Sequence, residues 1–150
     1  MCQTSESKNM NFNKLAPNFS VRDVKESVLF YQNILGFKLE IAVPDGSNSI
    51  ENEIHSETEY STAMMKKDDV FVMFIKHRKF EEDTQAFKGI TKGASVLFYV
   101  DVSSIDELYS GLKEKVEIEK ELETTWYGMR EFYIKDCNGY VLGFGEKNNT

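Results

Sequence analysis

Hydrophobic residues along the chain form two runs of the same design, separated by a charged stretch. In the first run, apolar residues over 15–21 are spaced as in a short strand, and those over 28–35 recur at helical spacing. Asp23 is suited to begin that helix as its N-cap, and Gly36 is suited to end it. The polar, acidic residues 45–60 are predicted to be a loop. Three strands are expected, over 37–43, 61–66 and 70–76.

The second run repeats this order. We expect a strand over 95–100 and then a helix that begins at Ser103 or Ser104. Three strands are expected after it, over 116–122, 131–135 and 140–144. The letters MMKKDDVFVMF (64–74) also align without a gap with IKDCNGYVLGF (134–144). The repeat therefore predicts two modules, each with one strand, one helix and three further strands.

Neither module is large enough to bury its apolar face well alone, so the two are expected to pair. We predict an α+β fold in which two βαβββ modules in tandem form a cupped mixed sheet. A single domain is expected over 15–147, with module 1 at about 15–80 and module 2 at about 94–147. Residues 1–14 are expected to be a flexible, polar tail, and residues 77–93 a charged connection.

The chain is acidic, with 18 Lys and Arg against 25 Asp and Glu and a net charge of −7. A general nucleic-acid binder would be basic, because phosphate contacts need cations, so no nucleic-acid partner is expected. The excess of acid has two interpretations: it keeps the protein soluble, or it forms a negative cleft that attracts a cationic ligand. The 11 Phe, 7 Tyr and 1 Trp supply rings for a core or for a pocket that takes a flat ligand.

Cysteine usage and the N-terminal residues indicate the compartment. Cys2 lies in the polar tail, so a bridge to Cys137, the other cysteine, is not expected. Residues 1–14 hold only scattered apolar residues and no signal segment. No run approaches the roughly 20 apolar residues that a membrane helix needs. We therefore expect a cytoplasmic protein with no membrane partner.

Two motifs resemble those of the vicinal-oxygen-chelate superfamily, which includes glyoxalases, bleomycin-resistance proteins and dioxygenases. LAPNFSVRDVKESVLFYQNILGF (15–37) is similar to the family's first strand, which ends in V-x-D, and to its helix, which bears F-Y before L-G-F. WYGMREFYIKDCNGYVLGFGE (126–146) is similar to its closing motif R-x-F-x-x-x-D-P-x-G, with Cys137 in place of the usual proline. The resemblance covers residues 15–146 and implies the glyoxalase/bleomycin-resistance fold.

Within the superfamily, the chain looks most like the bleomycin-resistance branch. The details that point there are Pro17 in the start A-P-N-F-S-V-R-D, the letters D-E-L-Y at 106–109, and Trp126 ahead of R-E-F. The family's tighter W-G-R-E-F is loosened here by Tyr127 and Met129. This departure leaves the identity of the ligand open.

Metal-using relatives bind a divalent ion through four strand positions that carry His, Glu and sometimes Gln or Tyr. The resemblance places these positions at Ala16, Met73, Ser95 and Gly143. Alanine and glycine have no side-chain donor, serine is rarely a ligand, and a methionine thioether is poorly suited to Zn, Ni, Mn or Fe(II). A catalytic metal needs about three protein donors and an open position. We therefore expect no metal and no cofactor.

The ligand site is expected on the hollow face of the cup. Strand alternation places Val141, Gly143 and Gly145 on one face of the last strand, and the same parity selects positions on the other strands. The predicted ligand-binding residues are Trp126, Tyr99, Phe71, Met73, Ser95, Leu97, Val141, Gly143, Asn18 and Arg130, with Ser20 and Ile75 on the same face.

Several of these residues have a second interpretation. Gly143 and Gly145 either make room for a ligand or relieve packing around a bend. Trp126 either stacks on an aromatic ligand or packs, partly buried, against the protein. Arg130 either contacts the ligand or has a structural use, positioning its loop or pairing with an acidic group.

The histidines and the acidic segment are the other polar groups that bear on a site. His55 and His77 are the only histidines, and a metal site is not expected at either one. The acidic segment, which we expect near the second half of the cup, either attracts a cation or is a solvated loop; its glutamates are Glu51, Glu53, Glu57 and Glu59. The sequence shows no Ser-His-Asp order, nucleophile elbow or phosphate-binding glycine loop.

The sequence thus favours a non-catalytic protein that sequesters a small aromatic ligand, for which a cationic group is an open alternative. The resemblance implies a homodimer with its grooves at the interface. Two other functions remain open. One is an enzyme of the superfamily (a lyase, an isomerase or a ring-cleaving dioxygenase), and the other is a regulatory or structural partner protein without a small ligand.

Overall fold

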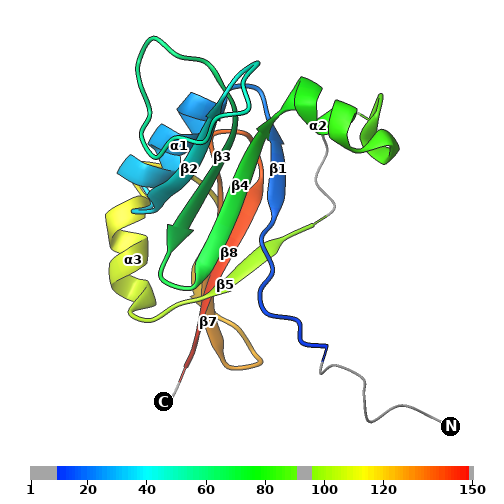
Figure 1. The fold of residues 1–150 in the computed structure, drawn as a ribbon. Coiled ribbons are helices and arrows are strands. Elements are labelled where there is room, and N and C mark those ends of the chain that lie inside the picture. The colour runs from blue at the N-terminus through cyan, green and yellow to red at the C-terminus, as the bar shows by residue number, and fades with distance from the viewer. Residues whose placement is uncertain (1–9, 91–95, 149–150) are drawn as a thin grey trace, which may run out of the picture.

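The computed structural model, which describes residues 10–90 and 96–148, contains two four-stranded mixed sheets, one from each half of the chain (Figure 1). Sheet A has the order β1-β4-β3-β2 and is built from β1 (Asn18–Val21), β2 (Lys38–Pro44), β3 (Tyr60–Lys67) and β4 (Val70–Lys76). Sheet B has the order β5-β8-β7-β6 and is built from β5 (Phe98–Asp101), β6 (Glu117–Thr124), β7 (Met129–Lys135) and β8 (Val141–Lys147). The predicted tandem βαβββ fold is confirmed.

One helix covers one face of each sheet. Helix α1 (Val24–Asn33) packs on sheet A, and helix α3 (Ile105–Leu112) packs on sheet B. The buried residues on these faces include Tyr31 and Phe74 in the first module and Phe132 in the second. No helix in the described part of the chain covers the opposite face of either sheet, and we call this opposite face the cup face.

Helices α1 and α3 begin at the predicted residues, but the start of α3 is capped by a different side chain than expected. Asp23 caps α1 as expected, accepting a hydrogen bond from the backbone N–H of Glu26 at 3.2 Å. Gly36 follows the end of α1 with a φ of +81°, which glycine adopts without strain. Ser104 begins α3, yet its hydroxyl makes no capping bond. The carboxylate of Glu146 on β8 does this instead, accepting the backbone N–H groups of Ser104 and Ile105 at 3.1 and 3.0 Å.

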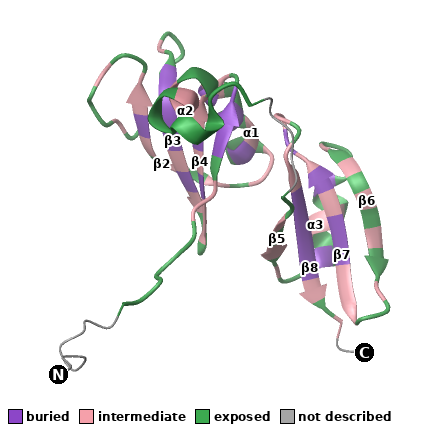
Figure 2. Ribbon diagram, turned by 90° about the vertical axis from the view of Figure 1, so that its right-hand side faces the viewer, coloured by how far each residue is buried: buried purple, intermediate pink, exposed green. Residues whose placement is uncertain are grey.

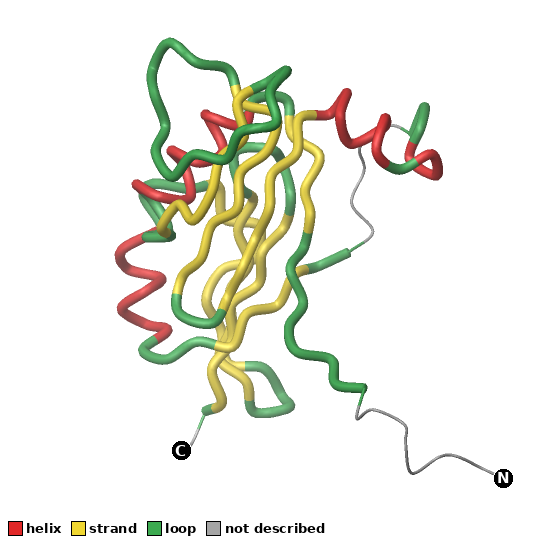
Figure 3. Tube along the Cα trace, viewed as in Figure 1, coloured by secondary structure: helices red, strands yellow, loops and turns green. Residues whose placement is uncertain are grey.

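The connection after β4 differs from the prediction. Residues 77–93 were expected to be a charged connection, and no helix was predicted in it, but the structure has helix α2 (His77–Asp83) and a 3₁₀ turn, η2 (Gln85–Phe87), there. Figure 3 shows this helix leaving the end of β4. The ring of Phe80 in α2 packs against that of Phe87 in η2, with ring centroids 4.7 Å apart. Such a small apolar contact gives no helical periodicity that could be detected in the sequence.

The two modules meet through buried polar and aromatic contacts near the turn between β7 and β8 (Figure 2). The hydroxyl of Tyr31 donates to Asp136 Oδ2 at 2.7 Å, and that of Tyr140 donates to the backbone carbonyl of Ser20 at 2.7 Å. The ring of Phe19 stacks on Tyr140 at 4.7 Å between centroids. Each contact joins the first half of the chain to the second.

Strand β6 lies at the outer edge of sheet B, where Figure 2 shows it to be largely exposed. Its sequence, EIEKELET, alternates four glutamates with Ile118, Lys120 and Leu122. Among the described helices, none combines the length and apolar character needed to cross a membrane.

Candidate functional site

The four positions at which relatives hold a metal lack suitable donors in this chain. Gly143 has no side chain, and an added Cβ would lie 3.0 Å from the ring of Tyr133 and 3.2 Å from that of Tyr99. Ala16 supplies only its carbonyl, which accepts the side-chain amide of Asn18 at 2.8 Å. Met73 supplies a soft thioether, and Ser95 lies outside the described residues. These residues do not fit a family-type divalent ion.

Tyr99 fills the space that the two glycines of β8 leave. β5 pairs with β8 in parallel, so that Tyr99 lies opposite Gly143 and Asp101 opposite Gly145. A Cβ added at Gly145 would overlap the hydroxyl of Tyr99. Of the two interpretations of these glycines, the structure therefore favours packing: the room they make is occupied by an aromatic ring of the same chain.

The hydroxyl of Tyr99 reaches a buried carboxylate on the cup face of sheet B. Glu131 on β7 is only 1% exposed. Its Oε2 accepts the hydroxyl of Tyr99 at 2.6 Å, while its Oε1 accepts Lys120 Nζ at 2.9 Å and the hydroxyl of Tyr127 at 2.8 Å. Tyr133 completes the group, with its hydroxyl 3.5 Å from Oε1. We call these five residues the Glu131 cluster.

The contacts set the protonation of the Glu131 cluster. Burial opposes ionisation of Glu131, but the hydrogen bonds from Lys120, Tyr99 and Tyr127 outweigh it and lower the pKa of the carboxyl. Burial, followed by the hydrogen bond to Glu131 and its charge, raises the pKa of Tyr99 strongly. The separate hydrogen bond that Tyr127 donates to Glu131 raises the pKa of Tyr127. The carboxyl of Glu131 is therefore held ionised and the phenols of Tyr99 and Tyr127 are held protonated, because the pKa of the acid moves down and those of the two phenols move up.

A Gly145→Ala substitution should test this packing directly. Because the new methyl group would displace Tyr99 from Glu131, we expect the free energy of unfolding to fall by about 1–3 kcal/mol. Gly111→Ala is a matched control, since Gly111 lies in α3 with no atom within 4 Å of an added Cβ. That change should stabilise the protein by about 0.5–1 kcal/mol. Urea denaturation measures both, and equal effects of the two would contradict the packing role.

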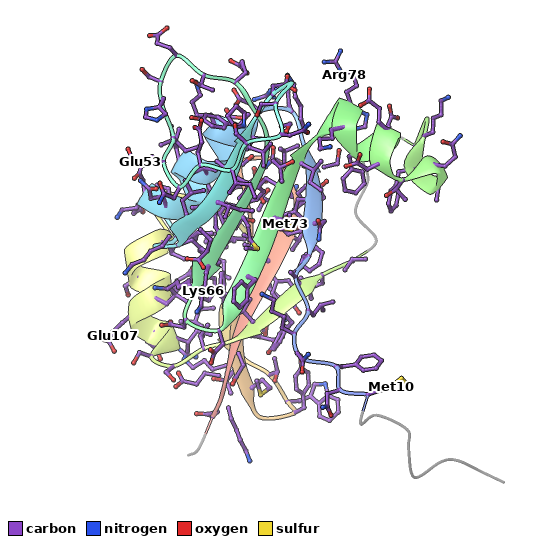
Figure 4. The ribbon with its side chains drawn as sticks, viewed as in Figure 1. Met10, Glu53, Lys66, Met73, Arg78 and Glu107 are labelled. Carbon is purple, nitrogen blue, oxygen red and sulfur yellow. The ribbon has the colours of Figure 1, made fainter. Side chains whose placement is uncertain are left out.

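The cup face of sheet A has a different chemistry. Asn18, Met73 and Met64 lie in one row across β1, β4 and β3. Phe71, farther along β4, has the ammonium of Lys14 3.7 Å from its ring centroid and that of Lys66 at 5.3 Å. Figure 4 shows Lys66 and Met73 at different heights of this face. The predicted residues Asn18, Phe71 and Met73 therefore share one surface, which is apolar with cations at one end.

Trp126 is 94% exposed at the tip of the loop between β6 and β7. The alternative of a partly buried, packing tryptophan is therefore wrong. Its ring lies edge-on to that of Tyr127, with centroids 5.3 Å apart. Since Tyr127 donates to Glu131, the tryptophan stands next to the Glu131 cluster.

Arg130 does not point toward the cup. It shares the helix-covered face with Phe132, and its guanidinium forms a two-point contact with Asp106 of α3, at 2.7 and 3.1 Å to Oδ1. Of the two interpretations of Arg130, this pairing with an acidic group favours the structural one. Leu97 and Tyr99 are exposed and Val141 is half-buried.

The acidic segment lies elsewhere than expected, whereas each histidine is where the sequence indicates, one in that segment and one just past a strand end. The segment runs beside β2, where Ala42 and Glu51 form a bridge, and its Ser56 carbonyl accepts Lys25 of α1 at 2.7 Å. It therefore borders the first module, not the second half of the cup, and Figure 4 shows Glu53 on that side. His55 lies in this loop, and His77 begins α2. Within 10–90 and 96–148, no three His, Cys, Asp or Glu side chains converge as a metal site would require.

Sequence reasoning found Tyr99 but missed its partners. The predicted site residues do not include the other four members of the cluster, which are Glu131, Lys120, Tyr127 and Tyr133. The available signal was the tight turn at 136–139, which fixes the register of β7 against β8 and places Glu131 opposite Gly145. Alternation along β7 alone gives no reason to assign a carboxylate to the interior of the cup.

Comparison with known proteins connects this geometry to a family. The sequence profile of the Glyoxalase/Bleomycin resistance protein/Dioxygenase superfamily matches residues 13–144. No curated protein matches the chain.

Solved structures show the same fold. TioX from Micromonospora sp. ML1 is 15% identical with a TM-score of 0.65, covering 91% of this chain and 99% of its own. A glyoxalase/bleomycin resistance protein/dioxygenase from Nocardioides is 17% identical with a TM-score of 0.69, covering 97% and 90%. TnmS3 from Streptomyces sp. CB03234, an antibiotic binding protein, is 15% identical with a TM-score of 0.63, covering 93% and 100%. At these identities the likeness establishes the fold alone.

Proposed function

Because the chain belongs to the glyoxalase/bleomycin resistance protein/dioxygenase superfamily, we propose that it sequesters a small aromatic, cationic molecule on its cup faces without a metal ion. The antibiotic binding protein TnmS3 shares this fold, which makes antibiotics of that chemistry one class of ligand to consider. The bleomycin-resistance branch fits this proposal because its members are expected to bind rather than to transform their ligands.

The observation that carries the proposal is the direction of the hydrogen bonds in the Glu131 cluster. The hydroxyls of Tyr99 and Tyr127 both donate to Glu131. A phenol has a single hydrogen, so the oxygen lone pairs that remain can only accept. Both tyrosines are partly exposed and would therefore present acceptors to a ligand. Acceptors select a donor, such as an amine or an ammonium group.

Charge and aromatic rings on the same face support this choice. One row of the register across sheet B holds three carboxylates, those of Asp101, Glu131 and Glu123. The positive charge next to this row is that of Lys120. This row favours a cation over an anion. The exposed ring of Trp126, beside the cluster, offers a surface on which a flat ligand can stack. Together these features fit an aromatic ligand with an ammonium group.

A second copy of the chain would close the groove. Phe12 and Leu15, ahead of the edge strand β1, are exposed, and so are Leu97 and Tyr99 at the edge strand β5. Exposed apolar side chains beside unpaired strand edges are typical of a surface that another chain covers. The homodimer is part of the proposal, and native mass spectrometry measures it.

Fluorescence titration tests the ligand class. Trp126 is the only tryptophan, so any quenching reports on this site alone. 9-Aminoacridine, a planar cation, should bind at least about tenfold more tightly than acridine-9-carboxylate, an anion on the same ring, which corresponds to about 1.4 kcal/mol. Calorimetry should show binding kept in Trp126→Phe and weakened in Trp126→Ala. Equal affinity for the two acridines would contradict the proposal.

Elemental analysis of the purified protein separates this function from an enzyme of the same superfamily. A divalent ion near stoichiometry, together with an activity that a chelator removes, would favour the enzyme. The donor set at Ala16, Met73 and Gly143 is the reason that we expect neither result.

A further inference from the structure

Three side chains outside the cup-face cluster lie in a line at the end of sheet A. Ser20, near the end of β1, has its Oγ 2.8 Å from His77 Nδ1. His77 Nε2 in turn lies 3.6 Å from Glu81 Oε2, one helical turn along α2. This arrangement cannot be read from the sequence, because the serine and the histidine are 57 residues apart and meet only when β1 pairs with β4. A hydroxyl, an imidazole and a carboxylate so arranged have the parts of an activated nucleophile.

The position of Glu81 determines what the imidazole can do. A carboxylate beside Nε2 favours the tautomer that carries its proton there, which leaves Nδ1 free to accept from the hydroxyl of Ser20. Glu81 is itself fixed, since its Oε2 accepts the backbone N–H of Gly89 at 2.8 Å. In the usual triad Nε2 faces the serine and Nδ1 faces the carboxylate, whereas here Nδ1 faces Ser20 and Nε2 faces Glu81. The chemistry requires only that one nitrogen faces the hydroxyl and the other the carboxylate.

Ser20 is held rigidly from the opposite module. Its backbone carbonyl accepts the hydroxyl of Tyr140 at 2.7 Å, and β1 pairs with β4 on its other side. A nucleophile fixed in this way needs little reorganisation to react.

The three side chains line a cavity of about 710 Å³ between the ends of β1 and β4 and helix α2. Val21 and Ile90 form apolar parts of its wall, and its cations are Arg22, Lys76 and Arg78. Arg22 is paired with Glu26 at 2.7 Å and Lys76 with Asp45 at 3.0 Å. Arg78 forms no hydrogen bond or ion pair with another described residue, although its charge adds to the hydrogen bond from Lys76 in lowering the pKa of Asp45. Figure 4 shows Arg78 at this end of the molecule. It is the cation available to an incoming anion.

We propose that this cavity hydrolyses carboxylic esters that carry a negative charge, with Ser20 as the nucleophile. The Ser20 oxygen attacks the ester carbonyl carbon while its proton passes to His77 Nδ1. The ester C–O bond then breaks, and the departing alcohol takes that proton, leaving an acyl group on Ser20. Water then attacks the acyl carbon while its proton passes to His77. The bond between that carbon and the Ser20 oxygen breaks, the acid leaves, and the proton on His77 returns to the Ser20 oxygen. Arg78 binds the substrate's anion, and no oxidant or reductant is needed.

A fluorophosphonate probe tests the nucleophile without knowledge of the natural substrate. Attack by Ser20 forms an O–P bond and releases fluoride, and peptide mass spectrometry locates the adduct. We expect wild-type protein to be labelled at Ser20 and Ser20→Ala to remain unlabelled. His77→Gln should react at least about 100-fold more slowly, because an amide cannot act as the base. Ser61→Ala, which alters another buried serine of sheet A, should keep the full rate.

Substrate selectivity is measured in the same variants. 4-Nitrophenyl hemisuccinate should be turned over with a lower KM than the uncharged 4-nitrophenyl butyrate, and Arg78→Gln should remove about tenfold of that preference. Far-ultraviolet circular dichroism confirms that each variant is folded. If Ser20→Ala fails to fold, the comparison of His77→Gln with wild type decides. Absence of an adduct on Ser20, or equal labelling rates in His77→Gln, would overturn the proposal.

Discussion

Replacing Asp136 by alanine is expected to lower the free energy of unfolding by about 3–5 kcal/mol. The carboxylate, buried in the turn between β7 and β8, accepts the Tyr31 hydroxyl at 2.7 Å and the backbone N–H groups of Asn138 and Tyr140 at 2.8 and 2.9 Å. Tyr31 is fully buried, so its hydroxyl would lose this acceptor in the interior. Urea denaturation at pH 7 measures the loss.

Tyr31→Phe isolates the link between the modules. It removes the donor while leaving the turn intact, so it should cost about 1.5–3 kcal/mol, and combining it with Asp136→Ala should cost less than the sum of the two. Asp106→Ala is the matched control, since Asp106 also accepts a charged hydrogen bond but is largely exposed. Its effect should be far smaller. Strict additivity, or a loss in Asp106→Ala as large as in Asp136→Ala, would show that the buried link is unimportant.

Glu131→Gln is expected to cost about 2–3 kcal/mol at pH 7, and the cost should depend on pH. Glutamine has the shape of glutamate but lacks the negative charge that accepts the hydrogen bonds from Lys120 and Tyr99. Because contacts lower the pKa of Glu131 in the folded protein, its contribution is fully present above the ordinary value of 4.5. It is lost as the pH falls through the lowered pKa. The difference in stability between wild type and variant should therefore shrink in acid.

Glu117→Gln serves as the control for that experiment. Glu117 also lies on sheet B and pairs with Lys135 at 3.4 Å, but its side chain is mostly exposed. Its substitution should change stability little at any pH. If the two variants followed the same pH profile, burial of Glu131 would not be the cause of its effect.

Most of the fold could be predicted because each element has a local cause. The apolar spacing between Asp23 and Gly36 marks α1, and alternation marks the strands that follow. Helix α2 was missed since it is short and has no buried residue. The capping of α3 by Glu146 was also out of reach, because that contact spans 41 residues and depends on how β8 lies beside the helix.

The candidate site could be predicted only in part. Parity along single strands identified Tyr99 and Gly143, which lie opposite each other in the structure. The function of Gly145 could not be inferred, because it depends on where the Tyr99 ring lies across the sheet. For Arg130 the sequence leaves ligand contact and structural pairing open, and only the position of Asp106 on α3 shows that its side chain turns away from the cup. Contacts between strands, not patterns within them, decide these cases.

The glutamates of β6 have a consequence for how the protein behaves when it is crowded. An outermost strand exposes a line of unpaired amide and carbonyl groups, which invites a foreign strand to dock and begin an aggregate. A copy of β6 arriving there would bring its own acidic ladder, EIEKELET, against an identical one. Repulsion between the carboxylates would weaken that docking, and more so at low salt. The edge strand β6 therefore discourages fibril growth, and self-association is expected to use the less charged edges of the two sheets.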